Sequence, residues 1–156
     1  MPQWLEESAD FPLRLAVCTG VEVLSNSRGD LQGRILVADD VPDAASSLAM
    51  LCEMYGAEVR LALDGVETVE VAASFRPDVI LMDITMPKLD GYSAARAIRR
   101  EEWGRAMTLI ALTGWGRSSD MQAAREAGFD GHLLKPVEPE ALVSLINKLR
   151  LTNRDT

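Results

Sequence analysis

Short apolar runs recur along most of this chain, and they alternate with stretches whose apolar positions follow helical spacing. The runs within 34–38, 78–82, 107–112 and 131–134 indicate buried parallel strands, because strands covered on both faces are apolar throughout. The segment 57–62 instead alternates apolar and polar residues, which predicts an edge strand with one wetter face. The pattern therefore predicts five strands.

Helical spacing predicts five helices, at about 42–55, 65–74, 91–101, 119–127 and 138–150. The first has a stripe of apolar positions formed by Val41, Ala45, Leu48, Leu51, Cys52 and Tyr55. Helix ends are marked by residues that favour them, namely Gly56 and Gly128 as C-terminal caps, Asp64 as an N-terminal cap and Pro139 in a first turn. Strict alternation of strands and helices predicts an α/β fold, with a parallel sheet covered on both faces and right-handed crossovers.

The first part of the chain, residues 1–33, differs in composition from the rest. It is rich in proline and glycine and has a polar stretch at 25–30, although 13–18 or 21–24 could form short strands. We interpret 1–33 as an N-terminal extension or linker of low order, 34–150 as one domain, and 151–156 as a C-terminal tail too short for an output domain.

Composition and charge narrow the classes of function. The chain has 156 residues, of which 47% are hydrophobic, and its net charge is −8. An acidic surface opposes phosphate backbones, so we expect no direct nucleic-acid binding. No run of about 18 apolar residues is present, and the acidic start does not resemble a signal peptide, so we expect a cytoplasmic protein without membrane insertion. Cys18 and Cys52 lack metal-binding spacing, and Cys52 lies on an apolar stripe, which indicates a buried thiol.

Residues with suitable chemistry follow four of the predicted strands. Asp39 and Asp40 follow the first strand, and Asp83, Thr113 and Lys135 follow the third, fourth and fifth. In an open α/β sheet, ligands bind at the carboxyl ends of the strands, so these side chains are expected to meet at one edge. The set suits a divalent cation and a phosphoryl group, with Asp83 as the nucleophile.

The acidic residues have a simpler alternative role as helix caps. Capping explains one of Asp39 and Asp40 but not both. Two carboxylates about 4 Å apart repel by roughly 4 kcal/mol at an effective dielectric near 20, and a bound cation offsets that cost. Oxygen-rich clusters select hard cations such as Mg²⁺, and Asp83 could then attack phosphorus in line to form an aspartyl phosphate.

The residues around Lys135 and Thr113 also have structural alternatives. Thr113 could be an ordinary strand residue, and Lys135 could be a solvated surface charge. However, the Lys135-Pro136 bond is a candidate cis peptide, which would hold the ammonium group over the site.

Taken together, these motifs resemble the receiver domain of bacterial two-component response regulators. The resemblance covers about 34–150 and is carried by Asp39-Asp40, Asp83, Met86-Pro87 with Asp90-Gly91, Thr113 and Lys135-Pro136. It implies a flavodoxin-like (βα)5 doubly wound fold with a five-stranded parallel sheet in the order 2-1-3-4-5. It also implies a signalling module that catalyses only its own phosphorylation and dephosphorylation.

The same resemblance implies roles for individual residues. Asp83 would accept phosphate from a sensor histidine kinase or a histidine phosphotransfer protein. The Mg²⁺ ligands would be Asp39, Asp40, Asp83 and the backbone carbonyl of Thr85. Thr113 and Lys135 would contact the phosphoryl oxygens.

One position departs from the family pattern, because His132 stands where the switch aromatic is usually Tyr or Phe. In the family, movement of the hydroxyl residue, here Thr113, draws this side chain inward and reshapes the face made by helix four, strand five and helix five. His132 is expected either to move in the same way or to stay as a partly exposed strand residue. Trp115 could affect access to the site, or could be a loop aromatic packed on the surface.

Three other classes of protein compete with this interpretation. A haloacid-dehalogenase-like phosphatase places its nucleophile on the first strand and a second Asp two residues later, whereas position 85 here is Thr. A nucleotide-binding protein needs a longer glycine-rich loop with a lysine than residues 114–116 provide. A degenerate receiver that only binds partners would not need the complete residue set. Residues 128–137 resemble receivers of hybrid sensor kinases, so the domain is either such a receiver or a single-domain regulator.

Overall fold

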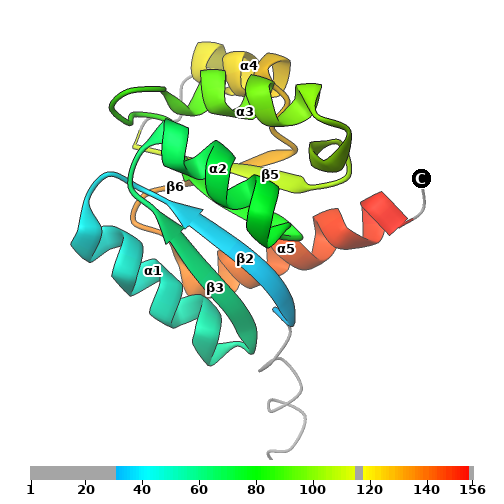
Figure 1. Cartoon of the computed structure of the whole chain (residues 1–156). Helices are drawn as coiled ribbons and strands as arrows, with labels where there is room; N and C mark the ends of the chain where they lie inside the picture. Colours follow the sequence, from blue (N-terminus) through cyan, green and yellow to red (C-terminus); the bar gives the residue numbers. More distant parts are fainter. Residues whose placement is uncertain (1–30, 115–117, 155–156) are drawn as a thin grey trace, which may run out of the picture.

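A parallel sheet of five strands forms the centre of the protein. A computed structural model describes residues 31–114 and 118–154, and Figure 1 gives the labels of the elements. The strand order is β3-β2-β4-β5-β6. The strands are β2 (Gly33–Ala38), β3 (Ala57–Ala62), β4 (Val79–Asp83), β5 (Thr108–Thr113) and β6 (Gly131–Leu134). In chain order this is 2-1-3-4-5, which confirms the predicted doubly wound topology and the edge position of the alternating strand.

Helices cover both faces of this sheet (Figure 1). They are α1 (Pro42–Met54), α2 (Gly65–Phe75), α3 (Gly91–Arg100), the 3-10 helix η2 (Glu102–Gly104), α4 (Ser118–Ala127) and α5 (Pro139–Arg154). One core forms where α2, α3 and α4 pack on the sheet, and includes Ala72, Ile98 and Ala124. A second core forms under α1 and α5 on the opposite face, and includes Leu48 and Ile146. The central strands β2, β4 and β5 are therefore buried on both sides, as their apolar runs predict. The prediction of a buried strand at 131–134 was wrong, because β6 is the other edge strand and Leu134 is 52% exposed.

Most helix ends lie where the sequence places them. The carboxylate of Asp64 accepts a hydrogen bond of 2.8 Å from the backbone N–H of Glu67, which confirms it as the N-terminal cap of α2. Gly56 and Gly128 follow α1 and α4 with φ of 98° and 111°, a conformation that glycine adopts without strain.

Three details differ from the prediction. Val41 does not belong to the apolar stripe of α1; it precedes the helix and is 52% exposed, because the helix starts at Pro42. η2 was not predicted, since three residues carry too little periodicity to reveal a helix. α5 continues to Arg154, beyond the expected end near residue 150.

Two further expectations concern the helices and the thiol. Cys52 in α1 is fully buried, as predicted, and burial followed by the charge of Glu53 raises the pKa of its thiol to about 12. Among the described residues, no helix is both long and apolar enough to span a bilayer. The expectations for Cys18, Trp115 and the possible strands at 13–18 and 21–24 concern residues outside the described part of the chain.

Candidate functional site

The register of the sheet brings the predicted site residues to one edge. Ala38 of β2 pairs with Met82 of β4, so Asp39 and Asp83 are the next residues on neighbouring strands. Across β4, Asp83 pairs with Leu112, and Thr113 in turn pairs with Leu134 of β6. The site residues therefore lie at the carboxyl ends of β2, β4, β5 and β6, which are consecutive in the sheet. This is where α/β sheets bind ligands.

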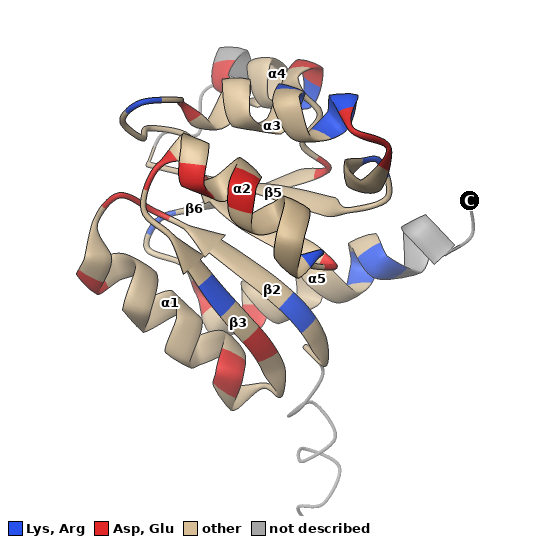
Figure 2. Ribbon diagram, in the orientation of Figure 1, with Lys and Arg blue, Asp and Glu red and all other residues tan. Residues whose placement is uncertain are grey.

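Three carboxylates converge at this edge. Asp39 and Asp83 are 2% and 8% exposed, whereas Asp40 is exposed to solvent. One carboxylate oxygen from each of the three lies within 4.8 Å of the others. Figure 2 shows acidic residues on the loop that joins β2 to α1. This grouping confirms that residues separated by more than forty positions in the sequence form one cluster.

Each buried carboxylate is oriented by the loop that follows it. Asp39 Oδ1 accepts a hydrogen bond of 3.0 Å from the N–H of Val41, and Asp83 Oδ1 accepts one of 3.1 Å from the N–H of Thr85. The second oxygen of each carboxylate points to the same cation. Loop backbone and side chain together hold the two groups in a fixed geometry.

That cation is the ammonium group of Lys135. Its Nζ lies 3.0 Å from Asp83 Oδ2 and 3.3 Å from Asp39 Oδ2. The backbone N–H of Lys135 donates to the carbonyl oxygen of Thr113 at 2.8 Å, and the Lys135–Pro136 bond is cis, as the sequence suggested. The lysine is therefore attached to the edge by both its backbone and its side chain.

Burial and charge shift the pKa values of this pair. Burial raises the pKa of Asp83, the nearby charge of Asp39 raises it further, and the hydrogen bonds from Lys135 and Thr85 only partly oppose this. Burial alone lowers the pKa of Lys135, but its contacts with Asp83 and Asp39 outweigh that effect and raise it. The lysine stays protonated, and one ammonium faces three carboxyl groups. The cluster therefore retains negative charge that a cation can balance.

The chemistry of the donors suits a hard divalent cation. All three side chains offer carboxylate oxygens, and no nitrogen or sulfur ligand belongs to the cluster. Magnesium prefers such oxygen ligands and completes its shell with water and phosphate oxygens. The exposed position of Asp40 leaves one side of the cluster open to solvent, as binding of an ion and an incoming phosphoryl group requires.

The two proposed switch residues occupy different surroundings. Thr113 is buried at the end of β5, next to the acidic cluster in the register of the sheet. His132 lies half-buried in β6 opposite Ala111. It lines a cavity of about 230 Å³ together with Met121 and Arg125 of α4. The histidine is thus apart from the carboxylates and has space beside it.

Sequence reasoning identified Asp90-Gly91 as a motif but missed its purpose. A Cβ atom at Gly91 would lie only 2.7 Å from the backbone oxygen of Asp83 and from the Cα of Ile84. The N–H of Gly91 also donates to the carbonyl oxygen of Ile84 at 2.8 Å, and Asp90 caps α3 through the N–H of Ser93. The glycine therefore lets α3 begin directly against the loop that carries Asp83. A glycine after a capping acid was the only signal for this contact.

A doubly wound sheet whose carboxyl edge combines three acids, a hydroxyl and a lysine defines a class of phosphate-handling signalling domains. The family model described as the response regulator receiver domain matches residues 35–147. The chain belongs to this family, and it is a receiver domain of two-component signalling systems. This membership rules out the phosphatase and nucleotide-binding alternatives.

Two curated relatives are similar to this chain over about three quarters of its length. The transcriptional regulator RpaA of Synechocystis is 32% identical over 78% of this chain, which spans about half (51%) of that protein. Protein PilH of Pseudomonas aeruginosa is 35% identical over 73% of this chain and 94% of its own length. The chain thus covers half of some relatives and nearly all of others.

Solved structures show the same fold. The receiver domain of sensor histidine kinase PA1611 from P. aeruginosa is 35% identical, has a TM-score of 0.70, and covers 74% of this chain and 95% of its own. Its crystal structure has a magnesium ion coordinated in the active site cleft. The chemotaxis protein CheY4 of Vibrio cholerae is 27% identical, with a TM-score of 0.72 and coverage of 75% and 98%.

Proposed function

We propose that Asp83 is the phosphoacceptor of this receiver domain, and that the phosphoryl group comes from a phosphohistidine on a sensor histidine kinase or a histidine phosphotransfer protein. The observation that carries the proposal is the convergence at Asp83. Its buried carboxylate lies 3.0 Å from Lys135 Nζ and is clustered with the carboxylates of Asp39 and Asp40. No other described group of three acids or thiols is arranged in this way.

The proposal includes Mg²⁺ as the cofactor, held by Asp39, Asp40, Asp83 and the backbone carbonyl of Thr85. The donor set supports it, and so does the magnesium ion in the cleft of the PA1611 receiver. When bound, the ion would neutralise negative charge on the carboxylates and on the incoming phosphoryl group.

The residues of the chain would then perform an in-line transfer. An oxygen of Asp83 forms a bond to phosphorus while the bond from phosphorus to the histidine nitrogen of the partner breaks, and that nitrogen keeps the electron pair. Lys135 and Thr113 contact the phosphoryl oxygens. For Lys135 this requires only that its Nζ exchange one of its two carboxylate partners for a phosphoryl oxygen.

The proposed output is a shift between two conformations. Thr113 moves toward the phosphoryl group and His132 turns into the space beside it, so that partner binding changes on the face formed by α4, β6 and α5. The domain acts on no substrate except its own phosphoryl group. The same proposal assigns residues 34–150 to the receiver, 1–33 to an extension and 151–156 to a tail, although β2 already begins at Gly33 and α5 continues into the tail as far as Arg154. It places the domain in the cytoplasm, where the buried free thiol of Cys52 suits a reducing compartment.

Intact mass spectrometry tests the phosphoacceptor. We expect incubation with Mg²⁺ and acetyl phosphate or phosphoramidate to add one phosphoryl group, with no addition in Asp83→Asn or in the presence of EDTA. Asp43→Asn is the matched control, because Asp43 is an acidic residue in the first turn of α1 outside the cluster. An unchanged mass in folded, Mg²⁺-loaded protein would overturn the proposal and indicate a degenerate receiver.

A second variant separates metal binding from the switch. Lys135→Ala should retain most of its Mg²⁺ affinity, because lysine donates protons and offers no ligand to a cation. It should lose the conformational response to phosphorylation, measured by the change in NMR signals of α4 and β6. Loss of Mg²⁺ binding in this variant would show that our role for Lys135 is wrong.

A further inference from the structure

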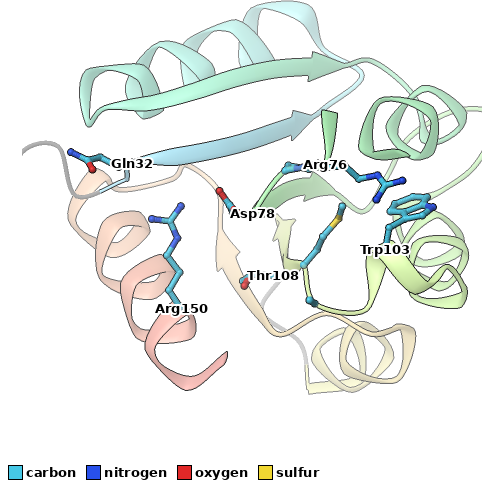
Figure 3. Close-up of a pocket in the computed structure, with 9 residues that line it drawn as sticks. Gln32, Arg76, Asp78, Trp103, Thr108 and Arg150 are labelled. Atoms are coloured by element: carbon cyan, nitrogen blue, oxygen red, sulfur yellow. The ribbon is translucent and has the colours of Figure 1, made fainter. Parts of the chain in front are cut away.

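The opposite edge of the sheet contains a cavity that the phosphoryl chemistry does not use. It has a volume of about 420 Å³ and lies where the chain enters β2, β4 and β5, next to the ends of α2 and α5 (Figure 3). Asp78 precedes β4 and Thr108 begins β5, whereas Asp83 and Thr113 end these strands. The cavity is therefore a full strand length away from the acidic cluster. Its volume falls within the range of about 300–1,000 Å³ that is typical of small-molecule sites.

Two arginines from different elements line this cavity. Figure 3 shows Arg150 projecting from α5 on one side and Arg76 beside the ring of Trp103 on the other. The Nε of Arg76 donates to the carbonyl oxygen of Ala73 at 2.6 Å, and its guanidinium carbon lies 5.3 Å from the centroid of the Trp103 ring. The guanidinium is thus held against an aromatic wall. Its two terminal amino groups meet no acceptor within the described part of the chain.

The lining of this cavity has a positive formal charge, although the chain has a net charge of −8. Two arginines and one acid, Asp78, line the cavity, so its lining has one more basic than acidic side chain. Asp78 Oδ2 already accepts a hydrogen bond of 2.9 Å from the N–H of Arg34. The side chains of Arg34 and Arg60 lie 5.7 and 4.8 Å from the ring centroid of Phe75, the residue before Arg76, and extend the basic surface. Figure 2 shows a basic position on β2, and a basic and an acidic position on β3.

We propose that the cavity between Arg76, Arg150 and Trp103 binds a small organic anion that carries a carboxylate or phosphate group next to a flat ring. Guanidinium groups recognise both anions through paired hydrogen bonds, and the indole face offers a stacking surface for the ring. Pro77 and Met107 add apolar side chains to the lining, to which Thr108 also belongs. The site would give the domain a ligand input separate from phosphorylation.

NMR titration of the full chain with paired probes tests this site. Adenosine 5′-monophosphate and indole-3-acetate combine a ring with an anion. Adenosine and indole lack the anionic group, and inorganic phosphate lacks the ring. The titrations are run in EDTA, so that no metal can draw anions to Asp83. At least one of the combined probes should bind tenfold or more tightly than its halves and should shift the amide signals of Asp78, Met107 and Thr108. The tighter of the two serves as the preferred probe for the variants.

Variants then separate the two parts of the site. Arg150→Gln should weaken the preferred probe at least tenfold, whereas Arg96→Gln removes one exposed charge on α3 and should change nothing. Trp103→Leu should reduce the affinity to that of the anion alone. If Arg150→Gln does not fold, Arg150→Lys keeps the charge without the planar fork and should show an intermediate loss. Equal weakening by Arg96→Gln, combined probes no better than their halves, or shifts confined to the edge of Asp83 would each overturn the proposal.

Discussion

The two edges of the sheet both contain charged side chains in close contact, but their partners differ. At the carboxyl edge, Asp39 and Asp83 share one ammonium group, that of Lys135, and burial raises the pKa of Asp83. At the amino edge, one oxygen of Asp130 accepts hydrogen bonds of 2.8 Å from Arg99 Nη2 and 2.9 Å from the N–H of Leu109. The first cluster has more acids than cations, whereas the second has matched charges.

Arg99 shows how complete the matching is at the amino edge. Besides Asp130, its guanidinium donates to four backbone carbonyl oxygens at 2.7–3.0 Å, those of Gly128, Gly104, Arg105 and Met107. One side chain thus joins α3, η2, the start of β5 and the turn before β6. Charges whose partners all come from the fold stabilise it, whereas a cluster with surplus negative charge costs stability and attracts an external cation.

The largest effect on stability should come from removing the Arg99 guanidinium at the amino edge. Arg99→Ala removes five hydrogen bonds and leaves the carboxylate of Asp130 without its cation, so we expect a loss of about 3 kcal/mol in the free energy of unfolding. Urea denaturation in the presence of EDTA measures it. Arg96→Ala, an exposed position on the same helix, should change stability by less than about 0.5 kcal/mol. Equal effects of the two variants would show that the Arg99 network is not stabilising.

A smaller effect should follow from crowding the charged edge. Gly91→Ala places a methyl group 2.7 Å from backbone atoms of Asp83 and Ile84, so α3 must shift, at a cost of about 1–3 kcal/mol. The shift should also slow phosphorylation by acetyl phosphate, because it moves the loop that carries Asp83. Gly114→Ala is the matched control, since a Cβ there has no neighbour within 4 Å among the described residues. Normal phosphorylation in a destabilised Gly91→Ala protein would show that the loop tolerates the movement.

The contrast between the edges also shows how much the sequence can predict. Apolar runs located the central strands β2, β4 and β5, because burial on both faces leaves a continuous signal in the sequence. Alternation located the edge strand β3, and the short apolar run at 133–134 located the edge strand β6. The predicted convergence of Asp39, Asp83 and Lys135 follows from topology alone, since parallel strands bring their carboxyl ends together. The predicted start of α1 was right, but Val41 was wrongly included in its apolar stripe, because apolar spacing does not show whether the residue before a helix packs against the core.

The amino edge was much less predictable. The partners of Arg99 are separated from it by 5 to 31 positions, and four of them are backbone carbonyls that no residue type reveals. The cavity between Arg76 and Arg150 likewise depends on how α5 packs beside the sheet. A site built from residues at strand ends is thus visible in a sequence, whereas one built from the packing of helix ends is not.

Removing a carboxylate from the carboxyl edge should raise the free energy of unfolding, whereas the two changes above lower it. Because the pKa of Asp83 is raised in the folded protein, the group stabilises the fold below its unfolded pKa of about 4, and this contribution is lost as the pH rises through the folded value. Asp83→Asn should therefore be more stable than the wild type at pH 7 in EDTA. The gain should be on the order of 1 kcal/mol, because Lys135 offsets most of the repulsion between carboxylates.

Urea denaturation of both proteins between pH 3 and 8 measures this difference. The advantage of the variant should appear as the pH rises from about 4, where the unfolded carboxyl group ionises. Mg²⁺ should reverse it, because an ion that binds only the folded wild type stabilises that protein by mass action. A wild type that is already more stable than the variant at pH 7 without metal would contradict the surplus of charge at this edge.

The smallest effect should come from an exposed ion pair at the same carboxyl edge. Lys88 Nζ lies 3.4 Å from Asp64 Oδ2, but the lysine is 69% exposed, so water screens the pair. The pKa of Asp64 is lowered chiefly by the backbone N–H of Glu67, with Lys88 contributing less. Lys88→Ala should leave the melting temperature unchanged, and the pKa of Asp64, followed by carboxyl NMR, should rise slightly and stay below its ordinary value.

A return of the Asp64 pKa to its ordinary value would show instead that the lysine controls it. An unchanged melting temperature in Lys88→Ala would mean that the position of a charge at this edge does not by itself decide its contribution to stability. Lys88 and Lys135 both follow strands at the carboxyl edge, and both contact aspartates. They differ in exposure, because the side chain of Lys88 is 69% exposed and that of Lys135 is 35% exposed. Lys135 also contacts two carboxylates that are withdrawn from water, where charges interact strongly. The surplus of charge at this edge therefore resides in the buried cluster around Asp83 and not in the loops that surround it.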